Sequence, residues 1–372
     1  MSRTYPENLP DLNSVQAIHA LGWDDTARAL QFVDWLCTLS PTHGLHIETV
    51  HSASADASFR RYFRIHSSTR SFILMDAPPD KENCQPFANV AQLMLKAGLR
   101  VPRVLHWDVM HGFMLLEDLG SQTMMQYFAA SGTDQRLFMF EQATDALVTW
   151  QQSSSPGVLP AYDEPLLRRE LSLFEQWYIN GHRQLSLNTQ QQADLYQVYD
   201  RLIEHNLRAP SVFVHRDFMP RNLMVSEDAS DTRLGILDFQ DAVYGPVTYD
   251  IASLMRDAFI SWDEDFCLDI TVRYWQKARS AGLLDFEDWH TDFGAFYRAV
   301  EWMGLQRHLK VAGIFARLSL RDHKPKYLAD TPRFIAYIRA TASRYRELFP
   351  LLRLIDQIEG NSPAVSYAFG RL

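Results

Sequence analysis

The stretch VFVHRDFMPRNLMV, residues 212–225, constrains the fold of this chain more than any other part of it. A polar loop lies there between two short apolar runs, Val212–Val214 and Leu223–Val225. Short apolar runs bounded by polar residues are typical of buried strands. A third apolar run, Leu234–Leu237, ends directly on Asp238. The pattern predicts a loop held between strands, with a second acidic residue at the end of a nearby strand.

Three side chains in these segments have the types that phosphoryl transfer requires. The reaction needs a carboxylate that orients the acceptor hydroxyl, and hard oxygen ligands that hold magnesium on the phosphates. Asp217 fits the first role, and Asn222 and Asp238 fit the second. The spacing His-Arg-Asp-x4-Asn followed by Asp-Phe matches the kinase signature, although Phe218 replaces a leucine and Gln240 a glycine. We predict a catalytic Asp217, metal ligands Asn222 and Asp238, and the cofactors ATP and Mg2+; two acidic turns beside a sheet are the alternative.

Three neighbours of this loop have supporting roles in the prediction. We favour a structural, hydrogen-bonded role for His215 over general base catalysis. Arg216 could neutralise the field around Asp217 or pair with an acid in the core, and both options stay open. Asp250, in Tyr-Asp-Ile-Ala, suits the N-cap of a helix and could also brace the loop from below.

Composition excludes several other classes of protein. Cys37, Cys84 and Cys267 lie far apart, which argues against a disulfide framework and fits a reducing cytoplasm. The net charge of −9 argues against general nucleic-acid binding. No apolar stretch reaches the length of about 18 residues that a membrane span needs, and the amino terminus does not resemble a signal peptide. We expect a cytoplasmic protein that binds neither nucleic acid nor membrane.

Hydrophobic periodicity divides the 372 residues into an α+β arrangement with two lobes. Residues 1–117 are expected to form an amino-terminal lobe with a leading helix within residues 1–40, a helix over Pro86–Ala97, and strands over Leu45–Val50, Phe59–Ile65, Phe72–Met75, Val104–Trp107 and Phe113–Leu116. Residues 118–372 are expected to be mostly helical, with helices over Leu137–Trp150, Leu166–Tyr178, Asp194–Asn206, Tyr249–Met255, Cys267–Ala281, Phe293–Ile314 and from Thr331 toward Phe349.

Two segments of the amino-terminal lobe are candidates for nucleotide binding. The turn at residues 52–58 occupies the place of a kinase Gly-rich loop but contains no glycine. Ser58, Arg60 and Arg61 could still face phosphates, although a plain polar hairpin explains the segment equally well. Residues Glu117 to Gly120 suit a hinge whose backbone meets adenine, with Glu117 and Leu119 as candidates, and an ordinary turn is the alternative.

The third strand departs from the kinase pattern. Kinases carry a lysine there that holds the α- and β-phosphates, whereas Ser71–Asp76 contains none. Either Lys81 or an arginine among Arg60, Arg61 and Arg64 supplies that charge, or phosphate binding depends mainly on magnesium.

Basic residues are concentrated near the carboxyl end. Between Arg298 and Arg346 there are eleven Lys and Arg residues but only three acids. A solvated basic face explains this as well as an anionic substrate does. If part of the stretch faces substrate, Gln306, Arg307 and His308 are the candidates for contacts with it.

Together these motifs resemble the aminoglycoside phosphotransferase-like kinases, the small-molecule branch of the protein-kinase fold. That resemblance implies two lobes, a small β-rich one and a larger, mostly helical one. A narrower similarity, to the bacterial anomeric amino-sugar kinases of cell-wall recycling, lies in residues 56–64, 75–79, 116–120 and 303–317. It implies ATP-dependent phosphorylation of N-acetylmuramate and N-acetylglucosamine at the C1 hydroxyl, and a product passed to a uridylyltransferase.

Two other functions compete with this one. The chain could phosphorylate another small hydroxyl compound, such as an aminoglycoside, choline or homoserine. A polycationic aminoglycoside would favour a carboxylate-rich acceptor wall, whereas the residues after Arg298 are basic. A nucleotide-binding pseudokinase is the second alternative, and the intact Asp217, Asn222 and Asp238 argue against it.

Overall fold

The computed structural model of the chain describes residues 21–23, 25–54, 59–129, 131–228 and 230–360. The chain divides into two compact units. The first unit comprises Met1–Gln122 and Met224–Asp241, and the second comprises Thr123–Leu223 and Ala242–Leu372. This differs from the sequence-based boundary at residues 117 and 118, because the division follows Gln122 and residues 224–241 return to the first unit. Among the described residues, no helix has the length and apolar character to cross a membrane.

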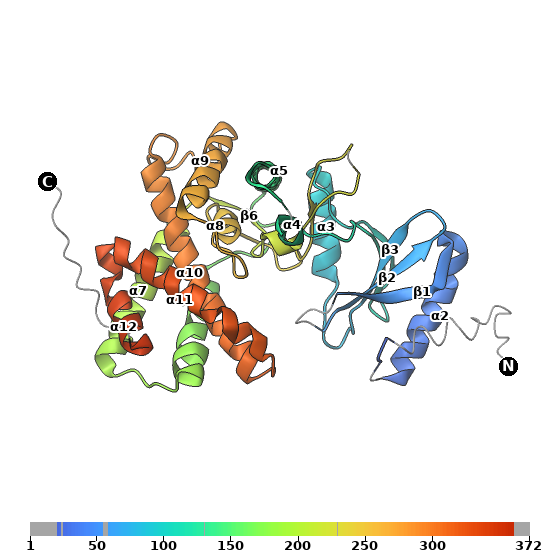
Figure 1. Ribbon diagram of the computed structural model, residues 1–372, viewed down its shortest axis with the longest axis horizontal. Helices are drawn as coiled ribbons and strands as arrows, with labels where there is room; N and C mark the ends of the chain where they lie inside the picture. Colours follow the sequence, from blue (N-terminus) through green and yellow to red (C-terminus); the bar gives the residue numbers. More distant parts are fainter. Residues whose placement is uncertain (1–20, 24, 55–58, 130, 229, 361–372) are drawn as a thin grey trace. The chain divides into compact units, whose positions relative to one another are not determined.

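A five-stranded antiparallel sheet forms the centre of the first unit, in the order β1-β2-β3-β5-β4. Figure 1 labels β1, β2 and β3 of this sheet. Along β2, Phe63 and Ile65 are buried, whereas Arg64 and His66 are not. This alternation buries one face of an antiparallel strand. The strands are β1 (Leu45–Ser54), β2 (Arg61–Ser67), β3 (Ser71–Asp76), β4 (Val104–Asp108) and β5 (Phe113–Glu117).

Helix α2 (Thr26–His43) packs on the apolar face of this sheet. The helix begins where the Asp25 carboxylate accepts hydrogen bonds from the N–H groups of Ala27 and Arg28, a side-chain cap that satisfies backbone donors at a helix start. Phe32 is fully buried and lies 5.2 Å, between ring centroids, from Phe113. The predicted leading helix is confirmed over this range, and residues 1–20 lie outside the described part of the chain.

The returning segment, residues 224–241, adds to the first unit beside α3 (Gln85–Lys96). Strand β7 (Leu223–Met224) pairs with β8 (Gly235–Ile236), and the Ile236 N–H donates to the Arg100 carbonyl at 2.8 Å. Phe239 is fully buried and its ring lies 4.9 Å from that of Phe87 on α3. These contacts position Asp238, which directly precedes Phe239.

The second unit is mostly helical, and a two-stranded ribbon carries the catalytic segment. Strand β6 (Ser211–Val214) pairs antiparallel with β9 (Val243–Pro246). The α-helices are α4 (Met124–Phe128), α5 (Thr133–Gln152), α6 (Glu164–Leu173), α7 (Thr189–Arg208), α8 (Tyr249–Met255), α9 (Glu264–Ser280), α10 (Phe293–Leu320), α11 (Thr331–Arg344) and α12 (Phe349–Glu359). Shorter turns of 3-10 helix lie at η2 (Pro220–Asn222), η3 (Pro325–Asp330) and η4 (Arg346–Leu348).

Helix α10 is the longest of the described helices and contacts α6, α7, α8, α9 and α11 (Figure 1). At the end of α6, Gly313 of α10 lies against the backbone of Leu173. A methyl group at Gly313 would overlap the Leu173 carbonyl, so glycine permits this approach. Directly after Leu173 the chain continues as a π-helix, η1 (Phe174–His182). The single helix predicted over Leu166–Tyr178 is therefore an α-helix followed by a π-helix.

Candidate active site

The predicted catalytic loop lies in the second unit, directly after strand β6. Val212, Phe213 and Val214 of β6 are buried, so the strand anchors the start of the loop in the core. The loop ends in the 3-10 turn η2, and β7 begins at Leu223. The prediction of a polar loop between two strands is confirmed.

Asp250 holds the backbone of the loop. Its carboxylate accepts hydrogen bonds from the N–H groups of His215 at 2.7 Å and Arg216 at 3.0 Å. Arg216 has a φ of +77°, a left-handed conformation that costs free energy and persists only where the surroundings enforce it. Burial raises the pKa of Asp250 to about 7, although the two backbone hydrogen bonds and Arg307 oppose the rise. These hydrogen bonds agree with the bracing role predicted for Asp250; the N-cap of α8 is Thr248, not Asp250.

The Asp217 side chain extends from this braced loop with 41% of its surface exposed. One of its oxygens lies 3.7 Å from Nη2 of Arg307. Burial would raise the pKa of Asp217, but the positive charges of Lys310, Arg307 and Arg216 outweigh it and hold the pKa below its usual value. The carboxylate is therefore ionised at neutral pH and able to accept a hydrogen bond from a hydroxyl group.

The other loop residues form hydrogen bonds within the loop and to the core, and these bonds fix the conformation of the loop. The Asp217 N–H donates to Nδ1 of His215 at 3.3 Å, in agreement with the structural role predicted for this fully buried histidine. Nδ2 of Asn222 donates to the Asp217 carbonyl at 2.9 Å, which orients the Asn222 amide group. Arg216 donates to Glu170 on α6 at 2.5 Å, and its charge also lowers the pKa of Asp217, so the two options left open for Arg216 occur together.

Asp238, the second predicted metal ligand, belongs to the first unit. Its φ of +64° is also left-handed, and its carboxylate accepts a hydrogen bond from Gln240 at 2.8 Å. Asp238 and Asp241 both lie close enough to Arg60 to raise the pKa of the guanidinium. Among the residues that the structure covers, no group of three or more His, Cys, Asp or Glu side chains could hold a metal ion.

The residues predicted to bind nucleotide have different surroundings within the first unit. Ser58 lies outside the described residues. Arg60 forms an ion pair with Glu82 at 3.0 Å and faces Asp238 and Asp241. The Arg61 guanidinium lies on the Trp23 ring at 3.7 Å and pairs with Asp76 at 3.1 Å.

The predicted hinge residues contact neighbouring arginines. Glu117 accepts two hydrogen bonds from Arg103, at 2.8 and 3.0 Å. Leu119 is buried, and its carbonyl accepts from Arg100 at 3.1 Å. Arg64 forms two hydrogen bonds with Asp118, at 2.6 and 3.0 Å. All three arginines are therefore paired with carboxylates, and the charges of Asp241 and Asp238 act on Arg60 in addition to its partner Glu82.

The three predicted substrate contacts on α10 point in different directions, because consecutive helical residues are about 100° apart. Gln306 is fully buried and donates to the Leu167 carbonyl of α6 at 3.1 Å. His308 is buried, stacks on Tyr337 of α11, and has a pKa lowered to about 3 by burial. Arg307 alone approaches Asp217, and only 2% of it is exposed.

Most cations of the basic stretch have acidic partners. Arg307 and Lys310 pair with Asp217 and Glu170, and the pairs nearer the surface are Arg298–Glu347, Arg321–Asp322, Arg333–Asp330, Arg339–Asp356 and Arg344–Glu301. Several of these acids lie outside the stretch, so its excess charge in sequence is largely neutralised in the structure.

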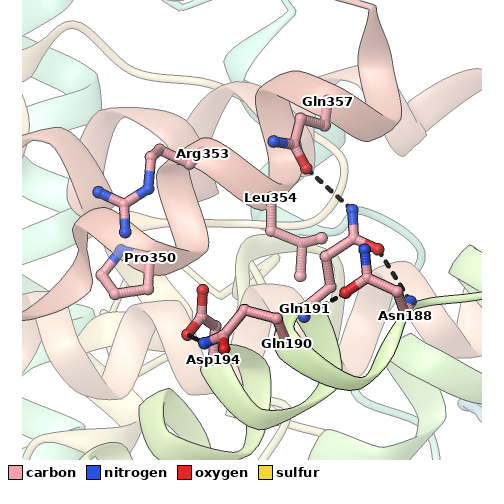
Figure 2. A pocket seen from close by; sticks show the side chains of 8 residues that line it. All are labelled: Asn188, Gln190, Gln191, Asp194, Pro350, Arg353, Leu354 and Gln357. Atoms are coloured by element: carbon pink, nitrogen blue, oxygen red, sulfur yellow. Dashed lines mark hydrogen bonds between the residues drawn. The ribbon is translucent and has the colours of Figure 1, made fainter.

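A surface pocket lies between α7 and α12, beside Arg353 (Figure 2). Its polar side chains form hydrogen bonds with one another, as Gln191 does with Gln357 at 2.9 Å.

Sequence reasoning missed two buried residues of this site, Glu170 and Lys310. Lys310 was recognised only as one cation of the basic stretch. A signal for both existed in the sequence, because each is a charged residue inside the apolar stripe of its helix, and such residues are rarely buried without partners.

Comparisons with known proteins agree with this geometry. The family described as phosphotransferase enzyme family matches residues 49–291. N-acetylmuramate/N-acetylglucosamine kinase of Pseudomonas aeruginosa is 48% identical over 315 residues, which is 84% of this chain and 89% of that protein. The protein of the same name from Neisseria meningitidis serogroup B is 44% identical over 336 residues, which is 90% of this chain and 97% of that protein.

Solved structures show the same fold at low sequence identity. The aminoglycoside phosphotransferase APH(2'')-Ib with bound ADP has a TM-score of 0.53 and 13% identity, covering 82% of this chain and 97% of that one. An ethanolamine kinase of Plasmodium vivax has a TM-score of 0.56 and 9% identity, covering 95% of this chain and 98% of that one. The predicted α+β, protein-kinase-like fold is confirmed.

Proposed function

The chain belongs to the phosphotransferase enzyme family, and from this premise we propose that it is an ATP-dependent kinase for the C1 hydroxyl of N-acetylmuramate and N-acetylglucosamine. The observation that carries the proposal is the ionised, partly exposed Asp217 carboxylate on a loop braced by Asp250. The relatives that are 44–48% identical and named for these two sugars support the choice of acceptor.

Asp217 orients the acceptor in this proposal. Its carboxylate accepts a hydrogen bond from the C1 hydroxyl and directs the oxygen at the γ-phosphorus. As the new O–P bond forms and the bond to the leaving ADP breaks, the hydroxyl proton passes to Asp217. A hemiacetal hydroxyl is more acidic than an ordinary alcohol, so a carboxylate with a lowered pKa suffices to accept its proton late in the reaction.

Asn222 and Asp238 remain the predicted magnesium ligands. Both offer hard oxygen donors, which Mg2+ prefers. A magnesium ion bound to a nucleotide typically takes only one or two protein carboxylates, and phosphates and waters complete its shell. When bound, the ion would neutralise phosphate charge. Each ligand is testable by itself, because its alanine variant should weaken the magnesium dependence of nucleotide binding.

Arg60 is the cation that we propose in place of the missing third-strand lysine. Arg61 and Arg64 are engaged by Asp76 and Asp118, and Lys81 lies over the Phe59 ring at 5.1 Å. The Arg60–Glu82 ion pair orients a guanidinium beside Asp238, and a planar guanidinium suits phosphate oxygens. Ser58, Glu117 and Leu119 stay proposed as nucleotide contacts on the sequence pattern alone.

Recognition of the sugar was predicted at three residues of α10. Arg307, with Gln306 and His308, was predicted to contact the acceptor, and the lactyl carboxylate of N-acetylmuramate is the group that an arginine would bind. The burial of Arg307 and its ion pair with Asp217 favour an electrostatic role at the catalytic carboxylate instead. We further propose a cytoplasmic location and consumption of the 1-phosphate product by a uridylyltransferase, which the family resemblance supports.

A coupled assay of ADP release tests the function. N-acetylmuramate and N-acetylglucosamine should be phosphorylated, whereas aminoglycosides, choline and homoserine should not. The methyl glycoside of N-acetylglucosamine is the matched control, because its C1 oxygen carries no proton while its other hydroxyls are unchanged. Turnover of the methyl glycoside would exclude C1 as the acceptor, and turnover of choline or an aminoglycoside alone would replace the amino sugars as substrates.

A further inference from the structure

Glu170 on α6 is a buried carboxylate that receives three side chains from three different segments. Only 4% of the residue is exposed. Its carboxylate oxygens accept hydrogen bonds from Arg216 of the catalytic loop at 2.5 Å and from the Tyr162 hydroxyl at 2.5 Å. Nζ of Lys310 on α10 lies 3.2 Å away. Burial raises the pKa of Glu170, but Lys310 and Arg216 outweigh it, so the pKa is lowered and the group is ionised.

The charges around Glu170 form one network with those around the catalytic aspartate. Arg216 and Lys310 carry two positive charges, and Glu170 supplies one negative charge. Asp217, whose pKa is lowered by Lys310, Arg307 and Arg216, supplies a second negative charge, and Arg307 adds a third positive charge 3.7 Å from it. Buried charges are tolerated when they are paired and hydrogen-bonded. Loss of Glu170 would leave Arg216 and Lys310 without the carboxylate that they share, and the catalytic loop would be the element free to rearrange.

The close approach of α6 and α10 brings Glu170 and Lys310 together. Gly313 lies against Leu173, and both residues are three positions beyond the paired charges on their own helices. Lys310 also donates to the Tyr249 hydroxyl of α8 at 3.1 Å. Asp250, the residue after Tyr249, holds the backbone N–H groups of His215 and Arg216. The loop is therefore held twice, at its backbone by α8 and at the Arg216 side chain by α6.

We propose that Glu170 is a positioning residue for catalysis, which fixes Arg216 in its left-handed conformation and thereby aims the Asp217 carboxylate. Glu170 does not touch the acceptor in this proposal and acts through Arg216. The proposal rests on the assignment of Asp217 as the catalytic carboxylate in the proposed function. It does not depend on which hydroxyl compound is the acceptor.

Glu170→Gln is the first test, because it removes the charge and keeps the shape of the side chain. We expect kcat to fall by about 10²-fold, the loss typical of a small misplacement of a catalytic group, while KM for ATP and for sugar changes by less than about threefold. Glu164→Gln is the matched control, since Glu164 lies on the same helix with 58% of its side chain exposed. A wild-type kcat in Glu170→Gln would overturn the proposal.

If Glu170 had a purely structural role, Glu170→Gln would lower the stability of the protein and leave the kcat of the folded molecules unchanged. The double variant Glu170→Gln/Lys310→Met distinguishes a structural role from a positioning role, because it restores the wild-type net charge around Arg216. We expect it to regain much of the thermal stability lost in Glu170→Gln. We expect its kcat to stay low, because Arg216 still lacks its carboxylate partner. Recovery of kcat together with stability would overturn the positioning role.

Amide hydrogen exchange tests the same proposal without any substrate. In Glu170→Gln the peptide that contains His215 and Arg216 should exchange faster, while peptides from α9 should exchange as in the wild type. Equal exchange in the loop would contradict the proposal. If the wild-type protein phosphorylates no amino sugar, the proposed function fails, and the exchange result still decides whether Glu170 holds the loop.

Discussion

Arg216 and Asp238 both adopt left-handed backbone conformations that side chains other than glycine rarely take. Such strained positions cluster at functional sites, where the surroundings over-determine them. For Arg216 the determinants are visible: Asp250 holds its N–H and Glu170 holds its guanidinium. For Asp238, a hydrogen bond from Gln240 and the burial of Phe239 against Phe87 fix the neighbouring positions. The strained positions are therefore Asp238 itself and Arg216, the residue directly before Asp217.

At Arg60, we expect substitution by alanine to raise KM for ATP by about 10-fold or more, because a charge-assisted contact with phosphate typically contributes about 1.5–3 kcal/mol. Steady-state kinetics with ATP as the varied substrate measures this. Arg64→Ala is the control from the same strand region, and it should lower thermal stability through the loss of Asp118 as a partner. An unchanged KM for ATP in Arg60→Ala would remove Arg60 from the phosphate site.

At Arg307, substitution by alanine should lower kcat for both amino sugars to a similar extent. The physical reason is that Arg307 is buried beside Asp217 and stabilises its ionised form. Kinetics on N-acetylmuramate and N-acetylglucosamine side by side measures the effect. A rise in KM confined to N-acetylmuramate would instead assign the lactyl carboxylate to Arg307, as its place in the basic stretch first suggested.

At Asp257, the expected effect is a dependence of stability on pH. Burial raises the pKa of Asp257 to about 6, although hydrogen bonds from Phe259 and Ile260 and the charge of Arg307 oppose the rise. Since the pKa is higher in the folded protein than in the unfolded chain, the stability that protonation contributes is present below about pH 4 and is lost as pH rises through about 6. A shift of this size corresponds to roughly 3 kcal/mol.

Asp257→Asn should remove this dependence. The difference in Tm between the variant and the wild type should grow in favour of the variant as the pH rises from 4 to 7. Thermal unfolding at several pH values measures it. Asp285→Asn, at an exposed position, should give a difference that does not vary with pH. A constant difference for Asp257→Asn as well would show that this carboxylate does not titrate in that range.

At the scale of elements, the contact between α6 and α10 is decisive for the site. Gly313→Ala should cost about 1–3 kcal/mol of stability, the usual cost of overpacking, because the added methyl group overlaps the Leu173 carbonyl. It should also lower kcat, because α10 carries Lys310 and Arg307. Urea unfolding and steady-state kinetics measure the two effects.

Gly304 on the same helix provides the control. A methyl group there would meet Ala252 and Arg256 only at 3.9 Å, an ordinary contact distance. Gly304→Ala should therefore be neutral, or stabilising by up to about 1 kcal/mol through helix propensity. If Gly313→Ala were as stable as Gly304→Ala, the close approach of the helices would not constrain the site.

The positions of most helices and strands could be predicted from hydrophobic periodicity. The places where the backbone departs from a regular helix could not. The stripe over Leu166–Tyr178 predicts one helix, and the structure changes from α to π after Leu173. The stripe contains no sign of this change, which falls at Leu173, the residue that Gly313 of α10 contacts. For Asp250 the sequence offered two roles, an N-cap and a brace of the catalytic loop. The N-cap is Thr248, and the Asp250 carboxylate bonds to His215 and Arg216, which are distant in sequence.

At the scale of the whole molecule, Asp217→Asn should separate turnover from nucleotide binding. The catalytic loop belongs to the second unit, whereas Arg60 and Asp238 belong to the first. We expect kcat to fall by roughly 10²–10⁴-fold, the usual contribution of such a carboxylate. The Kd for ATP, measured by calorimetry, should change little. Near-normal turnover would remove Asp217 from the reaction.

The spacing of one motif was enough to select Asp217 and Asn222, whereas it did not indicate the charged side chains that surround Asp217. Asp217 and Asn222 are five residues apart, a local distance that the sequence records directly. Glu170 and Lys310 reach the loop only through tertiary packing, from positions far away on either side of it. Periodicity cannot distinguish a buried lysine from a solvated one in a basic stretch. The charge balance around Asp217 therefore became visible only in three dimensions.

The discontinuity of the first unit has a consequence for how the chain is made. Leu234, Ile236 and Phe239 are buried in that unit, although they are synthesised after the first hundred residues of the second. At roughly 5–20 residues per second, a ribosome takes on the order of 10 seconds to pass from Gln122 to Asp241. During that interval the newly made sheet and α3 have left the exit tunnel, while the segment that covers Phe87 is still missing. The amino-terminal half of this protein thus emerges first and completes its folding late.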